Sequence, residues 1–213
     1  MKDFTILVLP NAYAASVAIT QDMLQAASVM AIRLKLPQPT WRVFSPDGGP
    51  VVLSSGLSME TERMPIRKSA DSSTWIVPGL GLDSPSAVAQ RLASAVCDKA
   101  VLRLRAHVNN GGSVAASCSA VFLLQAAGLL RGRRATTSWW LASELRRLEP
   151  DCVVDADRMV VSDGVVTTAG AAFGQSDLML HLLRMRFSSV LADAVAKVLL
   201  IDGRQSQSRF MVP

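Results

Sequence analysis

The chain has 213 residues, half of them hydrophobic, which fits one α/β domain with a sizeable core. Charged residues make up only 18%, which suggests that a partner covers part of the surface, and the net charge of +5 contains no long block of like charge. Ordinary solvated faces are therefore favoured over a nucleic-acid groove within the chain.

The N-terminal apolar run is too short for a signal peptide, and no stretch approaches the roughly 20 apolar residues of a membrane span. We therefore expect a cytoplasmic protein that does not enter membranes. The three cysteines, Cys97, Cys118 and Cys152, match no zinc-binding spacing and cannot all pair with one another. In a reducing compartment the thiols should be free, and we expect neither a metal nor a cofactor.

Strands and helices alternate through the first half of the chain. The apolar run over residues 4–9, stopped by Pro10-Asn11, predicts a buried parallel strand. Residues 15–35 predict a helix with an apolar face made of Leu24, Ala27, Ala31 and Leu34. Further strands are predicted at residues 41–45 and 74–77, and a small hairpin over residues 51–60.

The second half continues the pattern. One long helix is predicted after the turn at residues 78–81, with one side made of Val88, Leu92, Val96 and Leu102. A short strand at residues 113–116 runs into Cys118 and a helix over residues 120–127. Later elements are a helix at 141–148, strands at 153–154, 159–161 and 165–168 with a hairpin at Asp163-Gly164, and a helix at about 173–186. The last helix has one apolar face that would pack on the domain, made of Val190, Ala194, Val198 and Ile201. Such alternation predicts βαβ units and a mainly parallel sheet in a single domain.

The sharpest local feature is the transition from strand to helix at Ser117-Cys118-Ser119. A residue at such a turn projects into the crevice at the carboxyl end of the sheet, and the helix N-terminus favours a thiolate there. This is the logic of a nucleophile elbow, here without the usual flanking glycines. The alternative is a buried cysteine that acts as a small hydrophobic residue.

A cysteine nucleophile needs a base, and the chain offers only His107 and His181. Neither is expected at the carboxyl end of a strand, so both are interpreted as structural or surface histidines. The turn at Pro78-Gly79-Leu80-Gly81 could offer backbone N–H groups to an anion, although a plain turn explains it equally well.

Several segments, in order along the chain, resemble the ThiJ/PfpI group of the class I glutamine amidotransferase-like superfamily, and within it the GlxA-like branch fused to AraC-type DNA-binding domains. They are residues 6–10 with 22–27, residues 75–81, residues 111–118 with 122–130, residues 132–139, and residues 165–170 with 177–180. The resemblance implies a three-layer α/β sandwich with a flavodoxin-like sheet and the elbow at Cys118. It also implies a ThiJ/PfpI-like domain over residues 1–203, and a tail over residues 204–213 towards a helix-turn-helix domain that this sequence does not contain.

The chain departs from that family at the positions that handle protons. Ser119 stands where the enzymes often have His or a small residue, and Ser138 stands where the regulators usually have His. The acidic residue that supports the cysteine in some relatives falls near Ser16. A kept cysteine without these neighbours indicates a binding pocket rather than a reaction centre.

The resemblance therefore implies a non-catalytic, effector-sensing and dimerising domain of an AraC-type transcriptional regulator, which reaches DNA only through the separate domain. The candidate effector-binding residues are Asn11, Gly79, Leu80, Cys118, Ser119, Ser138 and Trp139. Two alternatives remain open: an amidohydrolase or glyoxalase-like hydratase acting through Cys118, and a redox-responsive chaperone-like protein that uses oxidation of this thiol.

Overall fold

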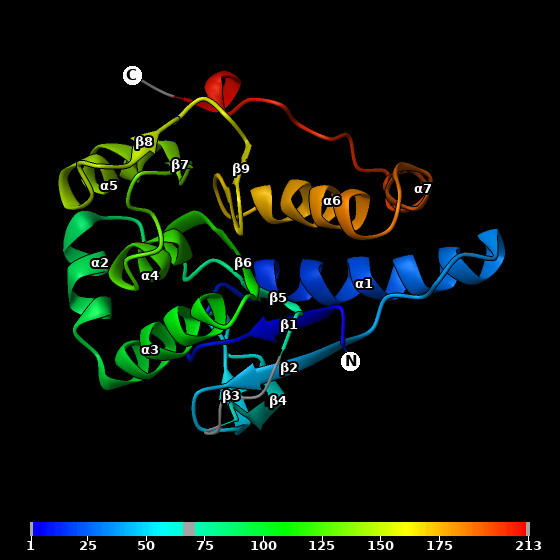
Figure 1. Cartoon of the computed structure of the whole chain (residues 1–213), viewed down its shortest axis with the longest axis horizontal. Helices are drawn as coiled ribbons and strands as arrows, with labels where there is room; N and C mark the ends of the chain where they lie inside the picture. The colour runs from blue at the N-terminus through cyan, green and yellow to red at the C-terminus, as the bar shows by residue number, and fades with distance from the viewer. Residues whose placement is uncertain (1, 66–70, 212–213) are drawn as a thin grey trace.

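The computed structural model describes residues 2–65 and 71–211, which form an eight-stranded sheet between two layers of helices (Figure 1). The strand order is β3-β4-β2-β1-β5-β6-β10-β9. The strands are β1 (Phe4–Leu7), β2 (Trp41–Ser45), β3 (Gly49–Val52), β4 (Ser58–Arg63), β5 (Thr74–Val77), β6 (Ser113–Ser117), β9 (Val160–Asp163) and β10 (Val166–Ala169). All neighbours from β4 to β10 pair in parallel, and only the two edge strands, β3 and β9, pair antiparallel. The predicted mainly parallel α/β sheet is confirmed.

The central strand β1 shows why the sheet is covered on both sides. Phe4 and Ile6 are fully buried among the side chains of one helical layer, whereas Leu7 is fully buried in the other. Successive side chains of a strand point to opposite faces, and all four residues of β1 are buried, so both faces of the sheet must be covered here. The sequence of β1 therefore requires a three-layer arrangement.

One helical layer consists of α1 (Ala14–Leu34), α6 (Gly174–Arg186) and α7 (Ser189–Val198), which pack on one another. The opposite layer holds α2 (Pro85–Leu92), α3 (Ala95–Asn109), α4 (Val121–Ala126) and α5 (Ala142–Leu148). Two very short strands, β7 (Arg134–Ala135) and β8 (Val153–Val154), pair in parallel beside this second layer. None of the helices within the described residues is long and apolar enough to cross a membrane.

The single long helix predicted after residue 81 is wrong, because two helices occupy this stretch. Ser84 caps α2 by accepting a hydrogen bond from the Ala87 N–H, and Ser94 caps α3 by accepting one from the Cys97 N–H. A serine at the N-cap satisfies a backbone N–H that would otherwise lack a partner, so α3 starts afresh at this point. Leu102, assigned to the buried side of the predicted helix, is 63% exposed.

The face predicted to pack in the last helix is also wrong. The residues of α7 that are buried against α1 and α6 are Leu191, Ala192 and Val195, while Val190 and Val198 are exposed. The polar residues Asp193 and Lys197 lie on the exposed side of the helix, opposite Leu191 and Val195, and the predicted face lies between these two sides.

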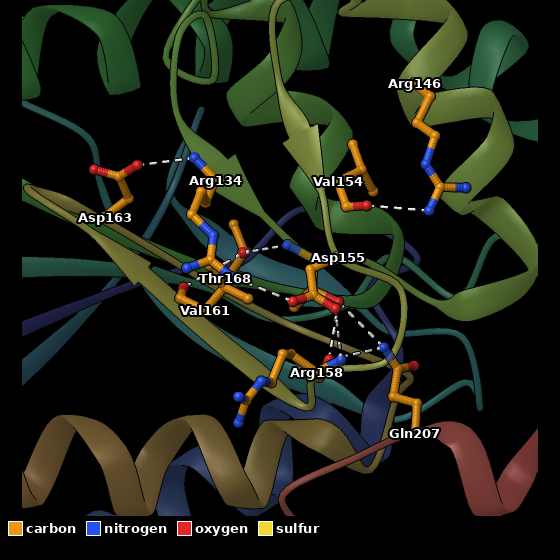
Figure 2. Close-up of polar contacts among 10 residues, drawn as sticks. Arg134, Arg146, Val154, Asp155, Arg158, Val161, Asp163, Thr168 and Gln207 are labelled. Atoms are coloured by element: carbon orange, nitrogen blue, oxygen red, sulfur yellow. Dashed lines mark hydrogen bonds and ion pairs between the residues drawn. The ribbon is translucent and has the colours of Figure 1, made fainter.

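The segment after α7 runs back across the molecule towards β8 and β9 and ends in a 3₁₀ turn at Ser208–Phe210 (Figure 1). Gln207 anchors it, being 1% exposed, with its amide nitrogen 3.0 Å from the Thr137 and Ala156 carbonyl oxygens. The same nitrogen lies 3.1 Å from the Arg158 carbonyl oxygen (Figure 2). Arg204 pairs with the buried carboxylate of Asp177 at 2.6 Å. The boundary predicted at residue 203 stays a prediction, and residues 212–213 of the predicted tail lie outside the described residues.

Candidate functional site

Cys118 lies directly after the last residue of β6 and begins a 3₁₀ turn that leads into α4, so the predicted elbow is confirmed. Its φ of 55° is in the left-handed region, where residues with a side chain are uncommon and which marks a strained turn. The Cys118 N–H donates to the Gly170 carbonyl oxygen at 2.8 Å, and the side chain is nearly enclosed, with 2% of the residue exposed.

Hydroxyl groups surround the thiol. The Ser138 hydroxyl donates to Cys118 Sγ at 3.0 Å, and the Thr137 hydroxyl donates to the Cys118 carbonyl oxygen at 2.8 Å. A Cβ placed on Gly79 would lie 3.1 Å from Cys118 Cβ, 3.4 Å from Ser16 Oγ and 3.7 Å from Ser117 Oγ. These three groups therefore converge on the space left by the missing side chain of Gly79. We call Gly79, Cys118, Ser16, Ser117 and Ser138 the elbow cluster.

Two hydroxyls of the elbow region, those of Ser16 and Ser117, differ in their hydrogen bonding. Ser16 donates to the Ala172 carbonyl oxygen at 3.0 Å, whereas the buried Ser117 hydroxyl has no hydrogen-bond partner within the described residues. Buried polar groups are rarely left unpaired, so Ser117 retains the capacity to bind a ligand atom or a water molecule. The hydroxyl of Ser119, next to the cysteine, accepts a hydrogen bond from the Leu82 N–H at 3.1 Å.

Both histidines of the chain have other partners. His107 stacks on Trp75 with ring centroids 4.6 Å apart, and its Nε2 lies 3.0 Å from the Ser73 carbonyl oxygen and 3.2 Å from that of Ser113. Ser113 begins β6 and Cys118 follows its end, so imidazole and thiol lie at opposite ends of the same strand. Burial lowers the pKa of His107, which favours a neutral, structural ring.

His181 lies on α6 and approaches Ser162 of β9, with its Nε2 2.8 Å from the Ser162 hydroxyl oxygen. Burial is the main cause that lowers the pKa of His181, and the positive charge of Arg184 lowers it further. The structure therefore brings neither imidazole to the elbow cluster, as expected from the sequence.

The other predicted binding residues, Leu80, Asn11 and Trp139, lie outside the elbow cluster. Leu80 is 4% exposed and belongs to the apolar core beside α2 to α5. Asn11 is exposed in a left-handed turn, with a φ of 59°, and its N–H donates to the Val52 carbonyl oxygen in β3. Trp139 is half-buried and lines a separate cleft. Gly79, Cys118 and Ser138 are thus brought together, whereas Asn11 and Leu80 have other surroundings.

Sequence reasoning missed Thr137 and Ser117 as members of this region. Thr137 was part of a motif that resembled the family, but only the position of Ser138 was given a chemical role. The signal for Ser117 was its place at the end of a strand, since the last residue before an elbow is buried beside the nucleophile position.

The other two thiols of the chain lie outside the elbow cluster. Cys97 is fully buried in the core, and Cys152 is 7% exposed. Burial raises the pKa of the Cys152 thiol to about 11, and the negative charges of Glu149 and Asp163 add to the effect. Within the described residues, no three His, Cys, Asp or Glu side chains gather closely enough to hold a metal ion.

Residues 17–185 of the chain match the model of the DJ-1/PfpI family. The chain belongs to this family. Both the resemblance found in the sequence and the fold that it implied are therefore confirmed. The match includes the elbow cluster except for Ser16, which lies immediately before it.

Two curated proteins are similar to this DJ-1/PfpI chain. The transcriptional regulator CdhR of Pseudomonas aeruginosa, of the helix-turn-helix type, is 27% identical over 216 residues, which cover 99% of this chain and 59% of the regulator. An uncharacterised protein of Streptomyces lividans is 35% identical over 108 residues, which cover 51% of this chain and 70% of that protein. The chain therefore spans little more than half the length of CdhR.

Solved structures share the fold. DJ-1beta of Drosophila melanogaster has a TM-score of 0.72 at 20% identity, and the alignment covers 95% of this chain and 100% of DJ-1beta. An AraC family transcriptional regulator of Pseudomonas putida also has a TM-score of 0.72, at 21% identity, with 93% of this chain and 100% of that one covered.

Proposed function

We propose that this DJ-1/PfpI chain is the effector-sensing part of a transcriptional regulator, and that a separate helix-turn-helix domain binds the DNA. The observation that carries the proposal is the alignment with CdhR, which extends over nearly the whole chain but over only 59% of that regulator. The part of CdhR outside the alignment is long enough to hold a DNA-binding domain.

The elbow cluster supports a binding role. Its hydroxyl groups can donate and accept hydrogen bonds, and the Ser117 hydroxyl is buried without a partner in the described part of the chain. A small polar effector that reaches this cluster would find hydrogen-bonding groups fixed by the surrounding backbone.

The side chains of the elbow cluster do not favour catalysis by Cys118. The Ser138 hydroxyl donates to the Cys118 sulfur, and a serine hydroxyl at neutral pH does not serve as a general base. The two histidines, which could serve, are bound to other partners. We therefore propose that the domain does not catalyse acyl transfer or hydration.

One observation favours the alternative function, a cysteine-dependent enzyme of the ThiJ/PfpI type. Cys118 keeps the strained left-handed backbone of an elbow, with a φ of 55°, and strain of this kind clusters at active sites. An enzyme of this kind would act on an amide or a reactive aldehyde and would depend on the Cys118 sulfur.

The experiment that separates the two functions uses the product of the whole natural reading frame. It is purified, and its binding to its own upstream DNA is measured by fluorescence anisotropy. We expect binding that a metabolite extract weakens or strengthens, and equal turnover of glutamine or methylglyoxal by the natural protein and by Cys118→Ala. Turnover that disappears in Cys118→Ala, together with no affinity for DNA, would overturn the regulator proposal.

We further propose a homodimer, because AraC-type regulators read paired half-sites and paired half-sites call for two-fold symmetry. The exposed apolar side chains of α1 and α7, Ile32, Val190 and Val198, offer a surface for such contact. Sedimentation at micromolar concentration is expected to show a species of twice the 22.8 kDa chain mass. A monomer at high concentration would assign dimerisation to another part of the regulator.

A further inference from the structure

A cleft of about 320 Å³ lies beside the elbow cluster but is distinct from it. Four aromatic side chains line it, Trp139, Trp140, Phe173 and Phe210, with Met159 at 3% exposure among its other apolar residues. A volume of this size is at the small end of the range for ligand pockets and is too small for a helix of a partner protein.

The aromatic lining is unusual for this chain. The whole sequence has only 11 aromatic residues, as 6 Phe, 4 Trp and 1 Tyr, so more than a third of them meet at this cleft. Phe173 and Phe210 are each 55% exposed and Trp140 is 38% exposed, although burial of such rings is favourable. The two indoles meet edge to face, with centroids 5.5 Å apart and planes at 84°, and present aromatic surface in two directions.

The charge of the lining restricts what can bind. Arg204 is the one charged side chain that lines the cleft, and Gln207 is the other long polar one. The Nε and Nη2 atoms of Arg204 are used by the Asp177 carboxylate, and Nη2 also donates to the Phe173 carbonyl oxygen. Its Nη1 forms no hydrogen bond within the described residues, so this nitrogen can still donate to one oxygen of a carboxylate.

From the aromatic walls and this arginine we infer that the cleft binds a small aromatic carboxylate. The ring of the ligand stacks against the indoles and the Phe210 ring, and its carboxylate accepts a hydrogen bond from Arg204. The inference rests on the proposed function only in taking this ligand to be a second effector, bound apart from the elbow cluster.

The position of the cleft gives binding a structural consequence. Arg204, Gln207 and Phe210 all belong to the segment that follows α7, whereas another wall, from Ala171 to Gly174, comes from the loop after β10 and the first residue of α6. A ligand between these walls is held by both, so it stabilises the docked position of the C-terminal segment relative to any undocked one. In the proposed regulator, this segment leads towards the part of the protein that binds DNA.

Two other occupants fit less well. An aromatic cation would suit the rings, since ammonium groups bind aromatic faces, but Arg204, which pairs with Asp177, offers only N–H donors and no acceptor for an ammonium group. A second copy of the chain would need to bury on the order of 800 Å² on each partner, much more than a cleft of this volume presents.

The test uses three probes with related carbon skeletons and isothermal titration calorimetry on the natural chain. They are 2-naphthoate, the saturated decalin-2-carboxylate and the cation 2-naphthylmethylammonium. We expect 2-naphthoate to bind, and the other two to bind at least about tenfold more weakly, because one lacks aromatic faces and the other has the wrong charge. Equal affinity for the three probes, or no binding of 2-naphthoate at millimolar concentration, would overturn the inference.

Variants locate the binding. Trp140→Ala and Phe210→Ala are each expected to weaken the binding of 2-naphthoate about tenfold, since each removes a ring on which the ligand stacks. Leu57→Ala removes a comparably exposed apolar side chain, 63% exposed, outside the cleft and is expected to bind as the natural chain does. Unchanged affinity in both aromatic variants would contradict the cleft assignment, as would a loss of self-association in Trp140→Ala, which would mark a contact between copies.

Failure of the inference and failure of the proposed function are distinguishable. Binding of 2-naphthoate to the cleft is measured without DNA, and the regulator proposal is measured by the affinity of the full reading-frame product for its own upstream DNA.

Discussion

At the residue scale, the three thiols of the chain have different surroundings and are expected to react at different rates. Cys118 begins a 3₁₀ turn with a left-handed backbone, and its sulfur accepts a hydrogen bond from the Ser138 hydroxyl. Cys97 is fully buried, and the pKa of Cys152 is raised to about 11, mainly by burial. We predict that limiting iodoacetamide labels Cys118 first, as read by peptide mass spectrometry.

The variant Ser138→Ala tests this prediction, because it removes only the hydroxyl that donates to the Cys118 sulfur. Loss of a hydrogen bond contributing about 1 kcal/mol is expected to slow Cys118 labelling by roughly fivefold at neutral pH. Faster labelling of Cys97 or Cys152 in the natural chain would mean that the elbow does not activate its thiol.

Gly79 is required by the closeness of its neighbours. A Cβ at this position would come within 3.1 Å of Cys118 Cβ, closer than side chains ordinarily approach. We predict that Gly79→Ala lowers the free energy of unfolding by about 1–3 kcal/mol, because a methyl group must be forced into a filled space. Urea denaturation measures the change. Gly203→Ala is the control, since a Cβ there meets no atom within 4 Å, and an equal loss in both variants would contradict the crowding argument.

At the scale of elements, the break between α2 and α3 depends on one hydroxyl. Ser94 accepts the Cys97 N–H at 3.4 Å and thereby starts α3. Ser94→Ala is expected to destabilise the domain by about 1 kcal/mol, the usual cost of a lost N-cap, with a corresponding fall in Tm. The exposed Ser86→Ala within α2 should have a smaller effect, and a neutral Ser94→Ala would show that tertiary packing alone fixes the break.

The same elements show what the sequence could predict. Short, largely apolar runs closed by turn residues predicted strands β1, β2 and β5, and these predictions are confirmed. The predicted elbow after β6 is confirmed as well. The break before α3 was missed because Ala93 and Ser94 are both compatible with a helix interior, and only the cap geometry reveals that one helix ends there.

The binding residues were harder to predict than the strands. Ser138 meets Cys118 across 20 residues of chain, and the motif resemblance brought them together in advance. The aromatic cleft involves Phe173 and Phe210 from segments without a common pattern, and only folding brings these side chains together. The buried face of α7, by contrast, could have been predicted, because Asp193 and Lys197 mark the side opposite Leu191 and Val195.

At the scale of the whole molecule, half-buried carboxylates link distant segments and make stability depend on pH. Asp71 accepts hydrogen bonds from the Arg42 guanidinium at 2.6 Å and the Trp75 indole at 2.9 Å. Burial alone would raise the pKa of Asp71, but these hydrogen bonds, that of Ser73 and the charge of Arg42 outweigh it and leave the pKa below the ordinary 3.8.

The sign of the effect follows from the lower pKa in the folded state. The stabilisation by Asp71 is complete above the pKa of the unfolded chain, near 3.8, and is lost as the pH falls through the lower folded value. We predict that the urea midpoint decreases from pH 6 to pH 3, and that Asp71→Asn, less stable at pH 6, shows a smaller decrease. An unchanged pH dependence in Asp71→Asn would assign the acid sensitivity to other carboxylates, such as Asp3.

The two helical layers differ in how far apart their members lie along the chain. Helices α2 to α5 follow one another in sequence, whereas α1 packs on α6 and α7, which are made near the end (Figure 1). During synthesis, which proceeds from the N-terminus, the second layer can assemble while the chain is still growing. The apolar side of α1 must wait for nearly the whole chain to leave the ribosome, so α1 is the surface on which we expect chaperones to act on this nascent protein.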